Sequence, residues 1–144
     1  MARSAGMLGM TYFWRSETLK IDKKGHQDLV SEANKALEEY IRLHITDAFP
    51  DGSILGEEDG FSPEKNDYVW VIDPIDGTAN FVAGIPVWMV VIALVKDFRM
   101  IAGFIYDTIQ DELYTAYVGE GALCNDKKLS VAPHADITSG SIAV

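Results

Sequence analysis

The chain has 144 residues, of which 48% are hydrophobic and 24% are charged, proportions typical of a globular domain with its own core. Its formal net charge of −10 argues against binding to nucleic acid or to an anionic membrane surface, because both require a basic face. The acidic balance does not exclude a phosphorylated substrate, since bound divalent cations reverse the local charge.

Cysteine content and hydropathy indicate where the protein works. Cys124 is the single cysteine, so no internal disulfide is expected, and a reducing compartment, the cytoplasm, is predicted. The longest apolar run, residues 85–95, is too short to span a membrane. The N-terminal stretch lacks a small-residue cleavage site, so no signal peptide is expected.

The first fifty residues are predicted to be mostly helical. Residues 2–16 are compatible with a helix weakened by two glycines, and residues 19–27 with a loop or short hairpin. From Asp28 onward, apolar residues recur at three- and four-residue steps, which predicts an amphipathic helix that ends before Pro-Asp-Gly at 50–52.

The rest of the chain is rich in short β-branched and apolar runs. These predict strands at residues 53–55, 68–72, 87–95, 100–106, 113–118 and 128–131, with a polar loop at 60–67 and a turn at 119–121. The short breaks between the later runs predict an antiparallel meander. Because the helices precede the strands, we expect an α+β fold with helices layered on one face of the sheet.

The most informative segment is Asp-Pro-Ile-Asp-Gly-Thr at residues 73–78, directly after a predicted buried strand. Asp73 and Asp76 are close together in a stiff turn, and their repulsion is costly unless a cation lies between them. Gly77 and Thr78 are predicted to open a helix, whose free N–H groups attract an anion. A cation site and an anion site on one turn indicate metal-dependent phosphate chemistry.

A second acidic group, Glu57 and Glu58, follows Gly56 at the exit of another predicted strand. Clusters of carboxylates alone suit Mg²⁺, Mn²⁺ or Ca²⁺ rather than zinc. Taken by themselves, however, Asp-Pro and Asp-Gly are common turn formers, and an acidic run is commonly a solvated loop. The three histidines show no metal-ligand spacing, and His44 is predicted to be packed on the second helix.

Gly-Glu-Glu at 56–58, followed by Asp-Pro-Ile-Asp-Gly-Thr-Ala-Asn-Phe at 73–81, resembles the inositol monophosphatase family of metal-dependent phosphatases. The likeness continues at residues 28–34, 112–116 and 119–125, and covers the chain from about residue 20 to 131. It implies the layered helix and antiparallel-sheet domain of the sugar-phosphatase fold. Residues 1–144 would form a single N-terminal metal-binding domain, with the family's C-terminal half absent.

The resemblance also implies a set of metal ligands. Glu57, Asp73 and Asp76 would bind Mg²⁺ through their carboxylates, and the backbone carbonyl of Ile75 would complete the first site. Asp73 would bridge two ions, and the complete family site holds two or three. The family's C-terminal half supplies a further ligand, which this chain lacks.

The implied catalytic residues are Glu57, Thr78 and Asn34. Glu57 would help to hold the attacking water, the Thr78 hydroxyl would orient it, and backbone N–H groups of Gly77 and Thr78 would bind the substrate phosphate. In the family, an aspartate that helps to activate the water occupies the position of Asn34. Asparagine forms hydrogen bonds but does not accept a proton at neutral pH.

The expected function is therefore Mg²⁺-dependent hydrolysis of a small sugar- or inositol-like phosphomonoester by a metal-activated water. Low activity is expected from the chain as given, because Asn34 replaces a carboxylate and the C-terminal half is missing. A homodimer is expected because family members commonly form one. The alternative is a catalytically silent homologue that acts as a binding or interaction protein. A non-enzymatic Ca²⁺-binding module would leave Thr78 without a role.

Overall fold

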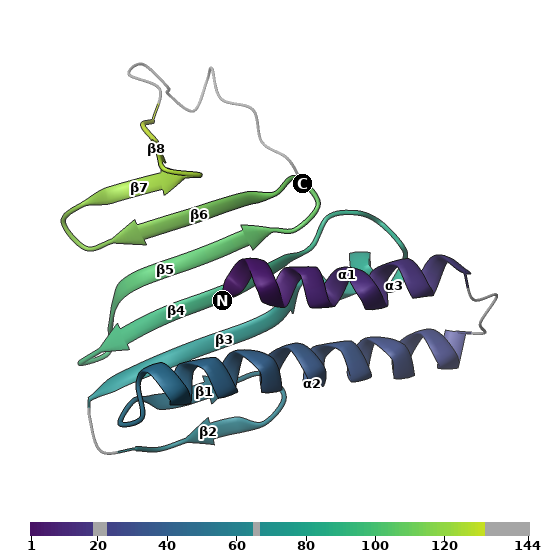
Figure 1. Cartoon of the computed structure of the whole chain (residues 1–144), viewed down its shortest axis with the longest axis horizontal. Helices are drawn as coiled ribbons and strands as arrows, with labels where there is room; N and C mark the ends of the chain where they lie inside the picture. Colours follow the sequence, from purple (N-terminus) through teal and green to yellow (C-terminus); the bar gives the residue numbers. More distant parts are fainter. Residues whose placement is uncertain (19–22, 65–66, 132–144) are drawn as a thin grey trace.

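The computed structural model describes residues 1–18, 23–64 and 67–131, apart from the side chains of residues 16–18 and 23–31 (Figure 1). The elements in this part of the chain are α1 (Ala2–Thr18), α2 (Lys23–Ala48), β1 (Ser53–Gly56), β2 (Gly60–Ser62), β3 (Tyr68–Asp76), α3 (Thr78–Val82), β4 (Met89–Lys96), β5 (Arg99–Asp107), β6 (Glu112–Tyr117), β7 (Gly121–Cys124) and β8 (Lys127–Lys128). None of the described helices is both long and apolar enough to cross a membrane.

The strands form one mixed sheet in the order β2-β1-β3-β4-β5-β6-β7-β8. From β3 to β8 every neighbouring pair is antiparallel, as the predicted meander requires. The pair β1 and β3 is parallel, because the chain turns back through the edge strand β2 before it enters β3. The sheet is therefore antiparallel except at one place, and that place lies beside the candidate site.

The two long helices lie side by side across one face of the sheet (Figure 1). Four apolar residues of α2 recur at four-residue steps and have no exposed surface: Ala33, Leu37, Ile41 and Ile45. This spacing forms the apolar stripe that a surface helix turns toward a core. The α+β fold with helices on one face is thus confirmed.

The central strands present alternate residues to the helices. On β3 these are Trp70 and Ile72, and on β4 they are Val90 and Ile92, all with at most 6% of their surface exposed. Successive side chains of a strand point to opposite faces, so the residues between them lie on the face away from the helices. The two faces of β3 therefore have different roles: one face packs against the helices in the core, and the other face carries Asp73.

An aromatic cluster joins α1, α3 and the start of β4. Phe13, Phe81 and Trp88 are all buried, and the ring of Phe81 lies edge-on to Phe13 and Trp88 at centroid distances of 5.3 and 5.0 Å. The chain approaches Trp88 closely at Gly9, where a Cβ would lie 2.7 Å from Trp88 Cη2. The glycines that weaken the helix prediction for α1 are thus packing residues.

Four local predictions need correction. Residues 60–62 form the edge strand β2 rather than part of a polar loop, because they pair with β1. Residues 23–27 begin α2 one and a half turns earlier than predicted, whereas residues 19–22 lie outside the described residues. The prediction for residues 121–131 was also wrong, because strand β7 at residues 121–124 was not predicted and β8 occupies residues 127–128 rather than 128–131. The fourth correction, at residues 73–76, concerns the site itself.

Gly9→Ala is expected to lower the melting temperature. Alanine gains about 1 kcal/mol of helix propensity over glycine. Its methyl group, however, would lie 2.7 Å from Trp88 Cη2 and 3.1 Å from Leu37 Cδ2, and both neighbours are buried. Overpacking of this kind costs about 1–3 kcal/mol. Thermal unfolding measures the change, with Thr11→Ala on the exposed face of α1 as control; a higher melting temperature for Gly9→Ala would contradict the packing account.

Candidate functional site

Parallel pairing of β1 and β3 places two acidic residues side by side. Gly56, the last residue of β1, is opposite Ile72 in the register, so Glu57 and Asp73 follow at the same level on neighbouring strands. Neighbouring parallel strands have their C-terminal ends on the same side of a sheet. Glu57 and Asp73 also line one open depression at the C-terminal ends of β1 and β3, together with Leu55 and Val71 on the same two strands. The prediction that the two acidic motifs reach the same end of the sheet agrees with this register.

A bulge brings Asp76 to the same face as Asp73. In a regular strand, residues three apart point to opposite faces. Here Asp73 pairs with Val91 and Asp76 with Met89, so three steps along β3 match two steps along β4. One extra residue therefore restores Asp76 to the face of Asp73. Residues 73–76 are thus a bulged strand end and not the predicted turn.

Pro74 and Ile75 form the buried side of this bulge. Both are fully enclosed, whereas Asp76 is exposed. Proline lacks an N–H for the strand ladder and is confined to edges and bulges within sheets. Proline at this position therefore suits the irregular strand end, which turns two carboxylates outward.

The carboxyl group of Asp73 is electrostatically strained. Burial first, and then the charge of Glu57, a hydrogen bond with Glu57 and the charge of Asp76, raise the pKa of Asp73 from 3.8 to about 6. The backbone N–H of Ile75 partly opposes this rise. The second oxygen, Oδ1, is buried and has no hydrogen-bond partner among the described residues. A divalent cation would satisfy this oxygen and neutralise the repulsion, so the donor set fits a hard cation such as Mg²⁺.

The three predicted carboxylate ligands are not yet gathered around one point. Within the described part of the chain, no three Asp, Glu, His or Cys side chains stand close enough together to hold an ion as they are. Glu57 and Asp76 are both exposed, and Glu57 already forms a hydrogen bond with Asp73. The metal roles of Glu57, Asp73, Asp76 and the Ile75 carbonyl stay predictions.

Gly77 and Thr78 open α3, as predicted. Gly77 has φ = 95°, a left-handed conformation that glycine adopts without strain, and a Cβ there would lie 2.9 Å from the carbonyl oxygen of Val87. The Thr78 hydroxyl donates a hydrogen bond to the Ile75 carbonyl at 3.0 Å. Because its one proton is used there, the Thr78 oxygen faces any further partner as an acceptor.

Asn34 lies on α2, which packs against α3. It is 5% exposed, and its Oδ1 atom has no hydrogen-bond partner within the described residues. A buried amide oxygen without a partner is costly, so this side chain is suited to receive a donor from a ligand or a water. Its role in the reaction stays a prediction.

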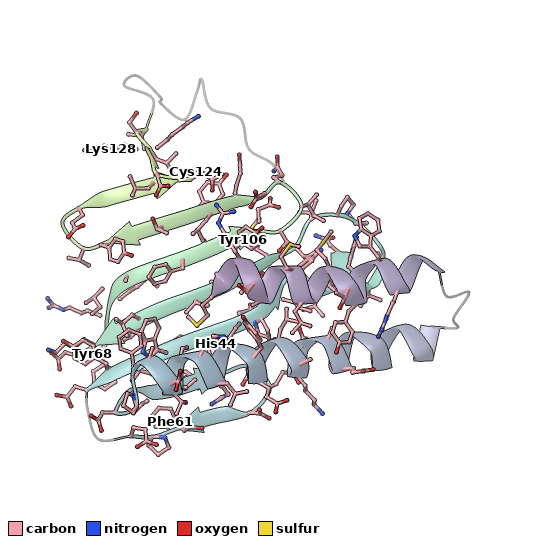
Figure 2. The ribbon with its side chains drawn as sticks, in the orientation of Figure 1. His44, Phe61, Tyr68, Tyr106, Cys124 and Lys128 are labelled. Atoms are coloured by element: carbon pink, nitrogen blue, oxygen red, sulfur yellow. The ribbon has the colours of Figure 1, made fainter. Side chains whose placement is uncertain are left out.

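Among the described residues, His44 and Cys124 lie outside this arrangement. Figure 2 shows His44 on α2 and Cys124 on β7, on separate elements well apart. His44 is exposed and stacks on Tyr40 at a centroid distance of 4.1 Å, so the prediction that it packs in the core is wrong. The side chain of His26 and all of His134 lie outside the described residues.

Sequence analysis missed two residues that bind the turn next to the candidate site, Glu38 and Arg42 on α2. They form an ion pair at 2.7 Å and bind the turn that carries Glu57. The signal was present, because Glu38 directly follows Leu37 on the apolar stripe and Arg42 stands four residues later. A charged residue within a buried helical stripe requires a partner.

Comparison with known proteins decides the family. A model of the inositol monophosphatase family matches residues 1–144. The chain belongs to this family. It is 39% identical over 132 residues to an inositol-1-monophosphatase of Mesorhizobium japonicum, across 91% of this chain and 50% of that protein. It is 38% identical over 136 residues to the Nus factor SuhB of Xylella fastidiosa, across 94% of this chain and 49% of that protein.

Solved structures of the family share the fold. The extragenic suppressor protein suhB of Bartonella henselae matches with a TM-score of 0.80 and 33% identity, over 92% of this chain and 51% of that one. The inositol monophosphatase of Anabaena matches with a TM-score of 0.77 and 33% identity, over 92% of this chain and 47% of that one. The predicted family and fold are confirmed, and the chain spans about half the length of the relatives it matches.

Asp73 is expected to destabilise the metal-free chain at neutral pH. Folding raises the pKa of Asp73 from 3.8 to about 6, so the folded chain binds this proton more tightly than the unfolded chain. The resulting stabilisation of the folded state is complete below pH 3.8 and is lost as the pH rises through about 6. At neutral pH with EDTA, Asp73→Asn should therefore melt at a higher temperature than the unmodified chain, and this advantage should vanish in acid.

The same variant tests the metal. Mg²⁺ should raise the melting temperature of the unmodified chain but not that of Asp73→Asn, because ligand binding stabilises only a folded state that holds the ligand. Asp51→Asn, an exposed substitution before β1, is the control and should respond like the unmodified chain. Equal protection of Asp73→Asn by Mg²⁺ would exclude Asp73 as a ligand.

Proposed function

We propose that this chain carries the metal and phosphate site of a Mg²⁺-dependent phosphomonoesterase acting on a small sugar- or inositol-like phosphate. The observation that carries the proposal is the pairing of Glu57 with Asp73, whose buried Oδ1 atom lacks a partner in the described structure. The relative from Mesorhizobium japonicum is named inositol-1-monophosphatase, which supports the substrate class. As the chain spans about half of such relatives, the activity of a whole enzyme is part of the proposal.

The residues at the bulge have separate tasks in this proposal. Glu57, Asp73, Asp76 and the Ile75 carbonyl would hold two or three Mg²⁺ ions. When bound, such ions neutralise the phosphate, lower the pKa of water and stabilise the leaving oxygen. Asp73, held on the central strand β3, supplies the fixed point of the site, while exposed Glu57 and Asp76 adjust around it.

The start of α3 would bind the substrate phosphate. Gly77 and Thr78 are partly exposed, and their N–H groups are the proposed donors to phosphate oxygens. The Thr78 hydroxyl already donates to the Ile75 carbonyl, so it accepts a hydrogen from the attacking water and orients the water's lone pair. Asn34 can hold the same water by its amide oxygen, but it cannot remove a proton.

A catalytically silent interaction protein is the second candidate function. Asn34 favours it, because the family's water-activating carboxylate is replaced by a neutral amide at a buried position. Several relatives, including the one from Xylella fastidiosa, are named as a Nus factor rather than as an enzyme. Under this candidate the metal pair would survive without turnover.

Phosphate release from inositol and sugar monophosphates, with Mg²⁺ or EDTA, separates the two candidates. We expect slow Mg²⁺-dependent turnover by the chain as given, and faster turnover by Asn34→Asp, since general-base assistance is worth about 10²–10⁴-fold. Thr78→Val, which removes the hydroxyl and keeps the shape, should abolish the gain.

A chimera that adds the C-terminal half of a homologue completes this test. Mg²⁺-dependent turnover by the chimera but not by the shorter chain would show that turnover needs the part of the relatives that this chain does not span. If neither the chimera nor its Asn34→Asp version releases phosphate, the silent candidate holds. Sedimentation of the same samples tests the predicted homodimer.

A further inference from the structure

Glu38 is a fully buried carboxylate for which the proposed reaction has no use. Its exposed fraction is 0%. An ionised carboxylate is costly to bury unless both oxygens find charged or hydrogen-bonding partners. Here Oε1 accepts from Arg42 Nε at 2.7 Å and from the Asp59 amide at 3.1 Å, and Oε2 accepts from the Glu58 amide at 2.8 Å. Two of these three donors belong to the turn between β1 and β2.

Arg42 extends the same contact to the second strand of the hairpin. Its Nη2 donates to the Gly60 carbonyl at 2.6 Å, and its Nη1 donates to the Ser62 hydroxyl at 3.1 Å. The planar guanidinium presents its donors in a fixed fork, so these bonds and the one to Glu38 set a single geometry. The Glu38–Arg42 pair therefore binds both the turn and β2 to α2.

Gly56 makes this approach possible. A Cβ at residue 56 would lie 1.9 Å from Glu38 Oε1 and 2.6 Å from Arg42 Nη2, and no side chain fits there. Gly56 directly precedes Glu57, so the residue that admits the carboxylate adjoins the acidic residue of the candidate site. The helix thus reaches the hairpin at the point where the backbone turns toward the site.

We propose that Glu38 is a positioning residue for Glu57, a role that rests on the proposed metal site. The peptide unit between Glu57 and Glu58 carries the N–H that Glu38 accepts, so the buried carboxylate sets the backbone from which the Glu57 side chain leaves. Strands β1 and β2 have only four and three residues, and β2 is a sheet edge. Such short pairing leaves the turn dependent on α2, whereas Asp73 belongs to β3, a strand that pairs with β1 on one side and β4 on the other.

Glu38→Gln tests the role with little change in shape. The glutamine keeps one acceptor oxygen, but it loses the negative charge. Its NH₂ group would face N–H donors that now bind a carboxylate oxygen. Calorimetry on the chain as it exists, titrated with Mg²⁺ at a temperature where all variants are folded, should show affinity weakened by about 10–100-fold, the usual effect of removing a group that orients a metal ligand. Glu39→Gln, the exposed neighbour on the same helix, should bind like the unmodified chain.

A double-mutant cycle distinguishes positioning from general stability. If Glu38 acts through Glu57, then Glu38→Gln as a single substitution should weaken Mg²⁺ binding. In a chain that already carries Glu57→Gln, it should cause no further loss of Mg²⁺ affinity. Full additivity of the two losses would overturn the proposal. Without metal, amide hydrogen exchange at Glu58 and Asp59 should accelerate in Glu38→Gln, and unchanged protection would also overturn it.

Three further outcomes complete the test. If Glu38→Gln does not fold, Arg42→Lys carries the same comparison, because it keeps the charge and loses the fork to Gly60 and Ser62. If the unmodified chain binds no Mg²⁺, the metal site itself fails, and the positioning role fails with it. Mg²⁺ binding that Glu38→Gln and Arg42→Lys both leave intact would overturn the positioning role alone.

Discussion

The parallel pairing of β1 with β3 is the constraint on which the candidate site depends. It is the one parallel pair in the described sheet, and its register places Glu57 and Asp73 at the same level of neighbouring strands. An antiparallel pair would send the two motifs to opposite ends. The bulge then adds Asp76 on the same face, and α3 begins two residues later at Thr78, after the left-handed Gly77.

The acidic residues of the candidate site are held close together although their charges repel one another. Burial first, and then repulsion from Glu57 and Asp76 at the same end of the strands, raise the pKa of Asp73. The aromatic and aliphatic core supplies the stability that tolerates this repulsion, and it includes Pro74 and Ile75, which are fully buried between Asp73 and Asp76. A site that is strained without metal is prepared to bind one, because the cation removes the repulsion.

Periodicity predicted the long elements well, since their core contacts repeat along the chain. The stripe from Ala33 to Ile45 and the apolar runs of β3 to β6 are signals of this kind. The segments that were predicted wrongly are short. Strand β2 has only three residues, Gly-Phe-Ser, which are too few to show an alternating pattern. At residues 73–76, proline and aspartate suggested a turn, but the neighbouring strand β4 keeps the segment in the sheet as a bulge.

The sequence by itself determined which donors exist and their order: an acidic pair after one strand, Asp-Pro-Ile-Asp after the next, and a glycine and threonine that start a helix. It also determined the family, because these residues lie in specific motifs. Tertiary structure alone decided that Glu57 meets Asp73, that Asp76 shares their face, and that Glu38 holds the turn from α2. Those relations depend on strand register and helix packing between residues far apart in the chain, and no local pattern encodes them.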